Sequence, residues 1–293
     1  MKRSWSEALV EPGGLLHSAD VPVSRKKAYQ KNKKRCLLFS KLPSEIRDVI
    51  WQYVFGGLPI HIFDDALDRN TCVAKACRLP VNPEREAVLL RKGEQSPYHV
   101  RHFRCFESPD QQGSNPRDQL QALVAVLRVC RQIHDEAALL PFVANFFSFA
   151  RFTSLSRFLD RLLPAQAHAI QQLAWLEHSN WSSHWHHAAG LALRRRVPSL
   201  SQVVVFVEFR QASVELFLRN GHTRGVRSAD LSEFLRGLAC GSLAKSHVAP
   251  LHPSSSLKDR EQFKGRVWQW AVDEERRMIG DVDADAETEV GCC

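Results

Sequence analysis

The chain has 293 residues, a hydrophobic content of 44% and a formal net charge of +8 at pH 7. A chain of this size and composition can bury a substantial core, so it is not one of the small proteins that depend on disulfides for stability. No run approaches the roughly 18 consecutive apolar residues of a membrane-spanning helix, and we therefore expect no membrane contact.

Charge is distributed unevenly along the chain. Residues 1–36 carry nine Lys and Arg against three acids, a net of +6, whereas residues 271–293 carry eight acids against two Arg, a net of −6. We expect the first segment to be a disordered basic arm. Its run of cations has the two-cluster pattern of a nuclear localisation signal, with a solvated arm as the alternative. The cations of this run are Arg25, Lys26, Lys27, Lys31, Lys33, Lys34 and Arg35.

The cysteines bear on where the protein is found. All eight are scattered along a chain that is too long to need disulfide staples. We therefore expect reduced thiols, which favours the nucleus or the cytoplasm as the location.

Residues 42–54 predict the first helix of the folded part. Pro43 suits its first turn and Gly56-Gly57 suits its end. Its apolar residues recur at helical spacing, and we expect this stripe to be core, with the docking of a partner as the alternative. Trp51 lies off the stripe and would pack at its flank or face a partner. The stripe comprises Ile46, Val49, Ile50, Tyr53 and Val54.

The longest patterned run, Leu120–Phe149, predicts the central element of the fold. Its apolar residues follow the period of an amphipathic helix of about 20 residues, which would begin after Asp118 and end near Pro141. Asn145–Phe149 is then predicted as a short buried strand. We expect the first helix to pack on this long helix.

Two pairs of polar residues lie one helical turn apart in the long helix. Arg131 with Asp135, and Gln132 with Glu136, have the i,i+4 spacing that lets side chains meet on a helix surface. A functional charge cluster is one interpretation. We favour a structural role, in which the pairs tie the helix to neighbouring backbone.

Strands and helices alternate through the rest of the chain. Leu58–Phe63 and Tyr98–Phe106 alternate like strands, with a further short strand at Ala87–Arg91. Between residues 145 and 209 the pattern is β–α–β–α–β, which predicts parallel crossovers loosely like leucine-rich-repeat units. Val203–Phe209 is the best candidate for a strand buried on both faces.

The predicted organisation is one domain with tails. The basic arm covers residues 1–36, and an α/β domain follows at residues 37–245. Residues 246–262 are predicted as a linker. Residues 263–293 combine an acidic tail with a helix that either docks or is untethered, through Phe263, Val267, Trp270 and Ile279.

No pattern typical of a catalytic site is present. The chain contains no G-x-S-x-G, G-x-G-x-x-G, G-x-x-x-x-G-K-[ST] or H-E-x-x-H sequence, so we predict no catalytic residue and no cofactor. Four histidines lie close together in the sequence, but no Cys or carboxylate recurs beside them at ligand spacing, so we predict no metal site. These are His178, His184, His186 and His187.

Two blocks of sequence together indicate a family. Leu42–Trp51 (LPSEIRDVIW) resembles the opening helix of F-box and F-box-like domains. Leu127–Ala137 (LRVCRQIHDEA) followed by Asn145–Phe149 (NFFSF) resembles the second block of a large fungal group of F-box-like proteins that carry a domain of unknown function. Val197–Leu200 (VPSL) matches a later block, so the resemblance spans about residues 38–210.

The resemblance implies a role in protein–protein interaction rather than a known reaction. An F-box grips the Skp-type adaptor of a cullin ubiquitin ligase through a three-helix bundle, whereas here a strand is predicted directly after the first helix. By this resemblance the partner-binding residues would be Leu42, Pro43, Ile46 and Trp51.

We therefore predict an α+β fold in which an F-box-like helix and a long central helix pack with a small mixed sheet of β-α units, flanked by disordered tails. The predicted function is a non-enzymatic protein-interaction module, with a substrate-receptor-like adaptor as its specific form. One alternative is a nucleic-acid-associated nuclear protein that uses the basic arm to contact phosphates. The other is an enzyme of unknown class.

Overall fold

The computed structural model of the chain describes residues 36–64, 72–77, 125–178, 187–208, 228–239, 243–251 and 269–279. The basic run Arg25–Arg35 and the strands predicted at residues 87–91 and 98–106 lie outside these ranges. None of the helices within the described residues has the length and apolar character needed to cross a bilayer.

A mixed sheet of six strands, in the order β2-β1-β3-β4-β5-β6, organises the described residues. Strand β2 pairs antiparallel with β1, and every other neighbouring pair is parallel. The predicted α+β fold with a small mixed sheet is confirmed. The strands are β1 (Pro59–Asp64), β2 (Cys72–Ala76), β3 (Phe146–Phe149), β4 (Gln172–His178), β5 (Gln202–Glu208) and β6 (Lys245–Leu251).

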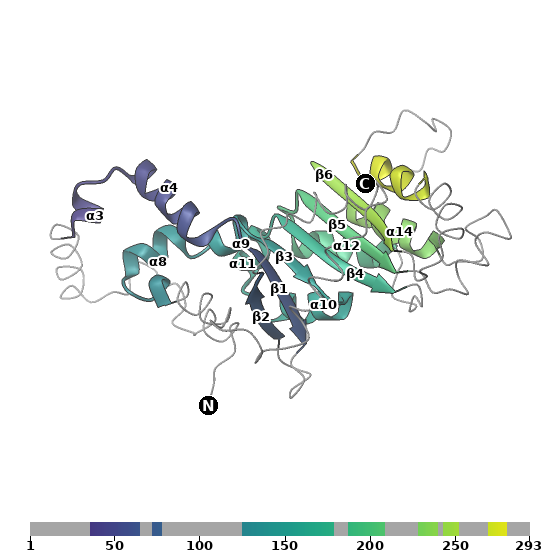
Figure 1. Ribbon diagram of the computed structural model, residues 1–293, viewed down its shortest axis with the longest axis horizontal. Helices are drawn as coiled ribbons and strands as arrows, with labels where there is room; N and C mark the ends of the chain where they lie inside the picture. Colours follow the sequence, from purple (N-terminus) through teal and green to yellow (C-terminus); the bar gives the residue numbers. More distant parts are fainter. Residues whose placement is uncertain are drawn as a thin grey trace.

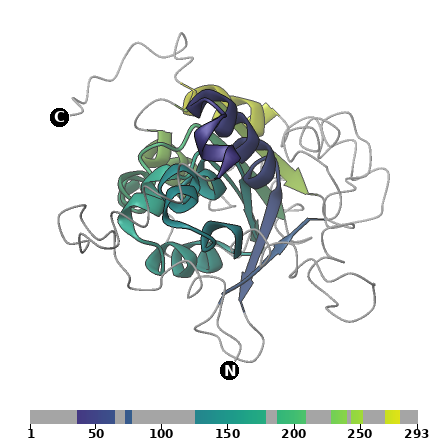
Figure 2. The same ribbon diagram turned by 90° about the vertical axis from the view of Figure 1, so that its left-hand side faces the viewer.

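From β3 onward the strands follow one another in chain order, with helices between them. Because parallel crossovers are right-handed, a sheet that always advances in one direction places its connecting helices on one face. Figure 2 shows these helices gathered on one side of the strands. The predicted β–α–β–α–β pattern is confirmed. The helices are α10 (Phe152–Asp160), α11 (Pro164–Ala169), α12 (His187–Arg196) and α14 (Ser228–Ala239).

Strand β5 is buried on both faces, as its apolar run predicts. Alternate residues of a strand point to opposite faces, so Val203 and Val205 join the large core beneath the helices, whereas Val204 and Phe206 join a second, smaller cluster on the other face. Its neighbours β4 and β6 complete its hydrogen bonding on both sides.

Helices α12 and α14 approach each other closely at two glycines. A Cβ atom added to Gly190 would lie 2.1 Å from the carbonyl oxygen of Phe234, and one added to Gly237 would lie 2.1 Å from the carbonyl oxygen of His187. Both distances are too short for real atoms, so the two backbones can approach this closely only because neither residue has a side chain.

A helical lobe, formed by α3, α4, α8 and α9, extends from the side of the sheet where β1 and β2 lie (Figure 1). It has an apolar core of its own, which is separate from the two clusters on the sheet. This core consists of Trp51, Phe55, Leu127, Ile133 and Ala137. The lobe helices are α3 (Leu37–Ser40), α4 (Ser44–Phe55), α8 (Arg131–Ala137) and α9 (Leu140–Val143).

The predicted long central helix is wrong. Residues 125–127 are helical, but Cys130 has the extended dihedrals φ −155° and ψ 157°, and α8 begins only after it. The carbonyl oxygen of Cys130 accepts the amide of His134 at 3.1 Å, so Cys130 caps a new, shorter helix. The break lets Leu127 and Ile133 pack into the lobe core together, and this tertiary packing overrides the helical period of the sequence.

The C-terminal part of the fold also differs from the prediction. Residues 246–251, predicted as a linker, belong to β6, which pairs with β5 along its whole length. The helix at 269–278 docks onto this edge: Glu275 accepts the amide of Val248 at 2.7 Å, and Ala271 and Met278 are part of the large core. Ile279, one of the residues predicted to dock it, is exposed. A helical cap therefore satisfies part of the β6 edge.

Candidate functional site

Helix α4 buries a different side from the one the sequence predicts. Its buried residues recur at every fourth position along one side of the helix, which points into the helical lobe. They are Arg47, Trp51 and Phe55. Arg47 is the reason for this orientation. Helical periodicity assigns an arginine to solvent, but Arg47 is buried together with a partner for its charge.

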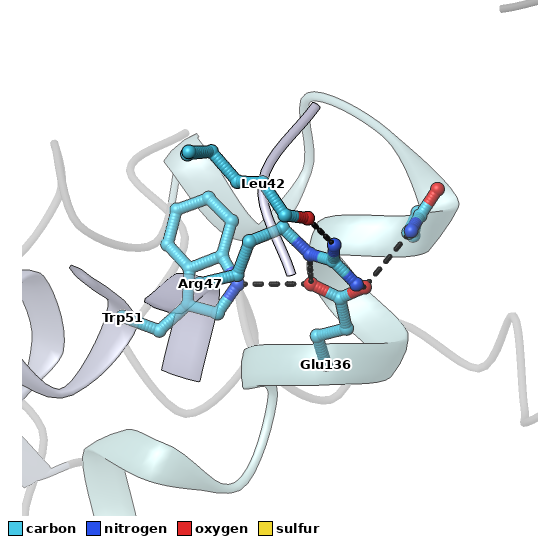
Figure 3. Close-up of polar contacts among 5 residues, drawn as sticks. Leu42, Arg47, Trp51 and Glu136 are labelled. Carbon is cyan, nitrogen blue, oxygen red and sulfur yellow. Dashed lines mark hydrogen bonds and ion pairs between the residues drawn. The ribbon is translucent and has the colours of Figure 1, made fainter. Parts of the chain in front are cut away.

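That partner is Glu136 of α8, and the two side chains form the centre of a polar cluster (Figure 3). Arg47 Nε donates to Glu136 Oε2 at 3.0 Å, and Arg47 Nη2 donates to Oε1 at 2.9 Å. Trp51 Nε1 donates to Oε2 at 3.0 Å, and Gln132 Nε2 donates to Oε1 at 2.9 Å. The remaining Arg47 nitrogen, Nη1, donates to the carbonyl oxygen of Leu42 at 2.6 Å. We call these five residues the Arg47–Glu136 clasp.

Hydrogen bonds within the clasp occupy both oxygens of the Glu136 carboxylate. Burial alone would raise the pKa of Glu136, but hydrogen bonds from Arg47, Gln132 and Trp51, together with the charge of Arg47, outweigh burial and lower the pKa to about 2. The hydrogen bond to Glu136 is in turn the main cause that raises the pKa of Arg47. Two oxygens that accept four hydrogen bonds have no lone pair left for a substrate. The clasp is therefore structural and does not serve as a general acid or base near neutral pH.

The polar pairs predicted within α8 have different environments. Gln132 and Glu136 meet as expected, but Glu136 also accepts hydrogen bonds from the side chains of Arg47 and Trp51 in α4 rather than from neighbouring backbone, which corrects the prediction. Arg131 and Asp135 form an ion pair at 3.5 Å whose side chains are 41% and 47% exposed. Through Glu136, the first pair connects α8 to α4.

A second joint, at Asn145, connects the helical lobe to the sheet. Asn145 is buried, and its Nδ2 donates to the carbonyl oxygens of Phe55 at 2.5 Å and Pro141 at 2.9 Å. Its Oδ1 accepts the amide of Leu58 at 2.8 Å. One side chain thus joins the end of α4, the first turn of α9 and the entry into β1. Gly57, with φ +75°, makes the turn between α4 and β1.

The apolar stripe predicted as core faces outward along most of its length. Ile50 and Val54 pack partly against the lobe core. The other three apolar side chains lie on the side opposite Arg47 and Trp51, so the prediction that the stripe is core is wrong. Ile46 is 50% exposed, Val49 62% and Tyr53 91%. We call Ile46, Val49 and Tyr53 the α4 stripe.

The four predicted partner-binding residues do not share one surface. Pro43 and Ile46 are exposed at the start of α4, and Leu42 beside them is half-buried. Trp51 is only 4% exposed and donates to Glu136, so it is an interior residue. Sequence reasoning identified Val49 and Tyr53 as apolar stripe residues but placed them in the core. No local signal could have linked Arg47 to Glu136, because 89 residues separate them.

Metal-binding chemistry finds no support in the described part of the chain. Within these ranges, no three His, Cys, Asp or Glu side chains gather in a way that could hold a metal ion. Of the four clustered histidines, His184 and His186 lie outside the described ranges. The α4 stripe, with three exposed apolar side chains on one side of a helix, is the candidate functional site.

Comparison with known proteins gives a family but no activity. Residues 31–196 match the family model described as Domain of unknown function (DUF7730). This match covers more than half of the chain and includes both α4 and α8. Neither the curated proteins nor the solved structures contain a match to the chain.

Proposed function

We propose an F-box-like, non-enzymatic role in protein–protein interaction for this chain. The chain belongs to the family described as Domain of unknown function (DUF7730). The docking surface is the α4 stripe. The observation that carries this proposal is the exposure of Ile46, Val49 and Tyr53 on one side of a helix whose opposite side is fixed by the Arg47–Glu136 clasp.

The arrangement supports docking for a physical reason. Exposed apolar side chains that lie together on a surface often mark an interaction site. Residues at positions i, i+3 and i+7 form one continuous row on a helix, which is the spacing by which a helix presents anchors to a partner. The clasp prevents α4 from rotating to bury the row, because rotation would leave the charges of Arg47 and Glu136 without partners.

The resemblance of Leu42–Trp51 to an F-box helix makes a Skp-type adaptor the first partner to test. A complete F-box surrounds this helix with the next helices in the chain, whereas here β1 follows α4 at once. Helices α8 and α9, which come from a distant part of the sequence, pack against α4. We propose that they replace the missing helices in supporting the docking surface, and that the protein acts in the nucleus or cytoplasm.

A binding experiment with purified components tests the proposal. Tagged full-length chain is mixed with a purified Skp-type adaptor, and the affinity is compared with that of an Ile46→Asp/Val49→Asp variant. Ile279→Asp is the control, because Ile279 is also an exposed apolar residue, 44% accessible, but lies after the C-terminal helix. We expect the wild type and the control to bind and the double variant to lose binding while its thermal melting is unchanged.

Two other outcomes would revise the proposal. If the wild type does not bind the adaptor, the adaptor form of the proposal is wrong. The same three proteins are then compared in pull-downs from cell extract with identification by mass spectrometry. A protein partner that the double variant loses and Ile279→Asp retains would still support docking on the α4 stripe, whereas identical partners for all three would overturn it.

A further inference from the structure

The charges of α4 are divided between its two sides. The helix contains three charged residues, of which Arg47 is buried and bound to Glu136. Glu45 and Asp48 are exposed, and neither forms an ion pair with any residue that the structure describes. The solvent side of α4 therefore carries two negative charges and no positive charge.

These acids lie along one edge of the α4 stripe. Glu45 lies one helical turn before Val49, at i,i+4 spacing, and Asp48 lies one turn after Glu45, on the side of the helix away from Ile50 and Val54. At about 100° of rotation per residue, both acids fall on the same edge of the stripe. The other edge is closed by Ile50 and Val54, which pack partly into the lobe core. A partner that covers the stripe can therefore continue its contact with α4 only across the edge that carries Glu45 and Asp48.

We infer that the partner segment seated on the α4 stripe is apolar and carries lysine or arginine side chains beside its apolar residues, where they meet Glu45 and Asp48. This inference rests on the proposed docking function and specifies the chemistry of the partner. A neutral or acidic partner would remove water from two carboxylates without replacing it, or would place like charges side by side. A basic flank replaces the lost hydration and gives the contact an orientation.

Two other occupants fit the α4 stripe and its acidic edge less well. A second copy of the chain, with the two α4 helices antiparallel about a two-fold axis, would place acidic edge beside acidic edge. The chain's own basic run, Arg25–Arg35, directly precedes the lobe and has the right charge, but Ala28 and Tyr29 are its only apolar residues. It therefore offers little to cover Ile46, Val49 and Tyr53.

Selection from a peptide library tests the inference and does not require the partner to be identified first. A phage-displayed library of random peptides of about 16 residues, enough for four helical turns, is selected on the full-length chain. Peptides that also bind the Ile46→Asp/Val49→Asp variant are removed. The enriched sequences are synthesised, and their affinity is measured by fluorescence anisotropy for the wild type, for Glu45→Lys/Asp48→Lys and for the control Asp135→Lys. Sedimentation measures the size of the free chain.

We expect enriched peptides in which Lys or Arg flanks apolar residues, and a loss of roughly tenfold or more in affinity on Glu45→Lys/Asp48→Lys but not on Asp135→Lys. Raising the salt concentration from about 0.05 M to about 0.5 M should weaken binding to the wild type and not to the charge-reversed variant. Enriched peptides with neutral or acidic flanks, or affinity unchanged by charge reversal, would overturn the inference and leave docking on the stripe intact.

The remaining outcomes also decide between the occupants. If no peptide depends on Ile46 and Val49, both the inference and the proposed docking function fail. If peptides bind only after residues 1–35 are deleted, the chain's own basic run is the occupant and the inferred external partner is wrong. A free chain that sediments as a dimer, and becomes a monomer in the Ile46→Asp/Val49→Asp variant, would assign the stripe to a second copy instead.

Discussion

Arg47 and Glu136 are 89 residues apart in the sequence and meet through two hydrogen bonds, from Nε to Oε2 at 3.0 Å and from Nη2 to Oε1 at 2.9 Å. The two side chains are only 10% and 20% exposed. Because both hydrogen bonds join one planar guanidinium group to one carboxylate, they hold α4 against α8 in one rotational position. It explains why the side of α4 that carries Ile46, Val49 and Tyr53 faces solvent.

Removing the charge of Glu136 should destabilise the fold. In Glu136→Gln the amide cannot accept hydrogen bonds at both of its terminal atoms, and Arg47 is left with a buried charge that lacks a counter-ion. We expect the free energy of unfolding to fall by about 2 kcal/mol, the scale of a hydrogen bond to a charged group. Urea titration followed by circular dichroism measures the change.

Asp135→Asn is the matched control for that substitution. Asp135 is the neighbouring residue and also pairs with an arginine, but its side chain is 47% exposed. Exposed pairs contribute about 0–1 kcal/mol, so its loss should be small. Equal destabilisation by the two variants would show that the clasp has no special role.

The clasp should also make stability depend on pH in the acid range. The pKa of Glu136 is lowered from its ordinary 4.5 to about 2 in the folded state. A lowered folded-state pKa gives stability that is complete above the unfolded pKa and is lost as the pH falls through the folded one. The difference in unfolding free energy between wild type and Glu136→Gln should therefore shrink as the pH falls from 4.5 to about 2. A difference that stays constant over this range would contradict the assignment.

Part of the sheet was predictable because the information for those strands is local. Val203–Phe209 is a short apolar run and Leu58–Phe63 alternates, and both are strands within a residue or two of the expected bounds.

The break at Cys130 was not predictable. The apolar residues on both sides of it keep the helical period, and only their packing against Trp51 and Phe55 reveals that two separate elements share them.

Enlarging either glycine at the crossing of α12 and α14 should destabilise the protein. In an exposed helix, Gly→Ala usually stabilises by about 1 kcal/mol, so the helical propensity predicts the opposite sign. At Gly190 and Gly237 the new methyl group would collide with backbone of the other helix, and overpacking of this kind costs about 1–3 kcal/mol. Thermal melting of each Ala variant measures the effect.

The double variant and an exposed control refine this test. Both methyl groups would act by separating the same two helices, so Gly190→Ala/Gly237→Ala should cost less than the sum of the single changes. Ala192→Ser, at an exposed site of α12, should change stability by less than about 0.5 kcal/mol. Stabilisation by the single alanines would show that the helices do not approach as closely as described.

Removing the buried amide of Asn145 should loosen the joint between lobe and sheet. Asn145→Ala leaves the amide of Leu58 and the carbonyl oxygens of Phe55 and Pro141 without this partner. Each buried group left unsatisfied costs about 1–3 kcal/mol, so we expect a loss of about 3 kcal/mol or more by urea titration. Asn145→Asp should not restore stability near neutral pH, because a carboxylate would face two carbonyl oxygens. Full stability in Asn145→Asp would exclude the hydrogen-bonding scheme.

The candidate site was predictable in its residues but not in its orientation. The spacing of Ile46, Val49 and Tyr53 marked an apolar stripe correctly, yet in most helices such a stripe faces the core. Any hydrophobic pattern assigns an arginine to the solvent-facing side. No residue near Arg47 in the sequence indicates that Glu136 neutralises its charge. Trp51 lies off the stripe in that pattern and was expected to pack at its flank or to face a partner, although its indole is part of the lobe core.

The orientation of α4 is most directly tested by comparing the melting temperatures of two variants. Ile46→Asp/Val49→Asp adds charges to the exposed side and should leave the melting temperature nearly unchanged. Trp51→Ala removes the indole from the buried side and should lower the free energy of unfolding by about 3–5 kcal/mol. The melting temperature should then fall by roughly 10 °C. If instead the aspartate variant melts far below the wild type and Trp51→Ala does not, the stripe is core, and the docking surface proposed here does not exist.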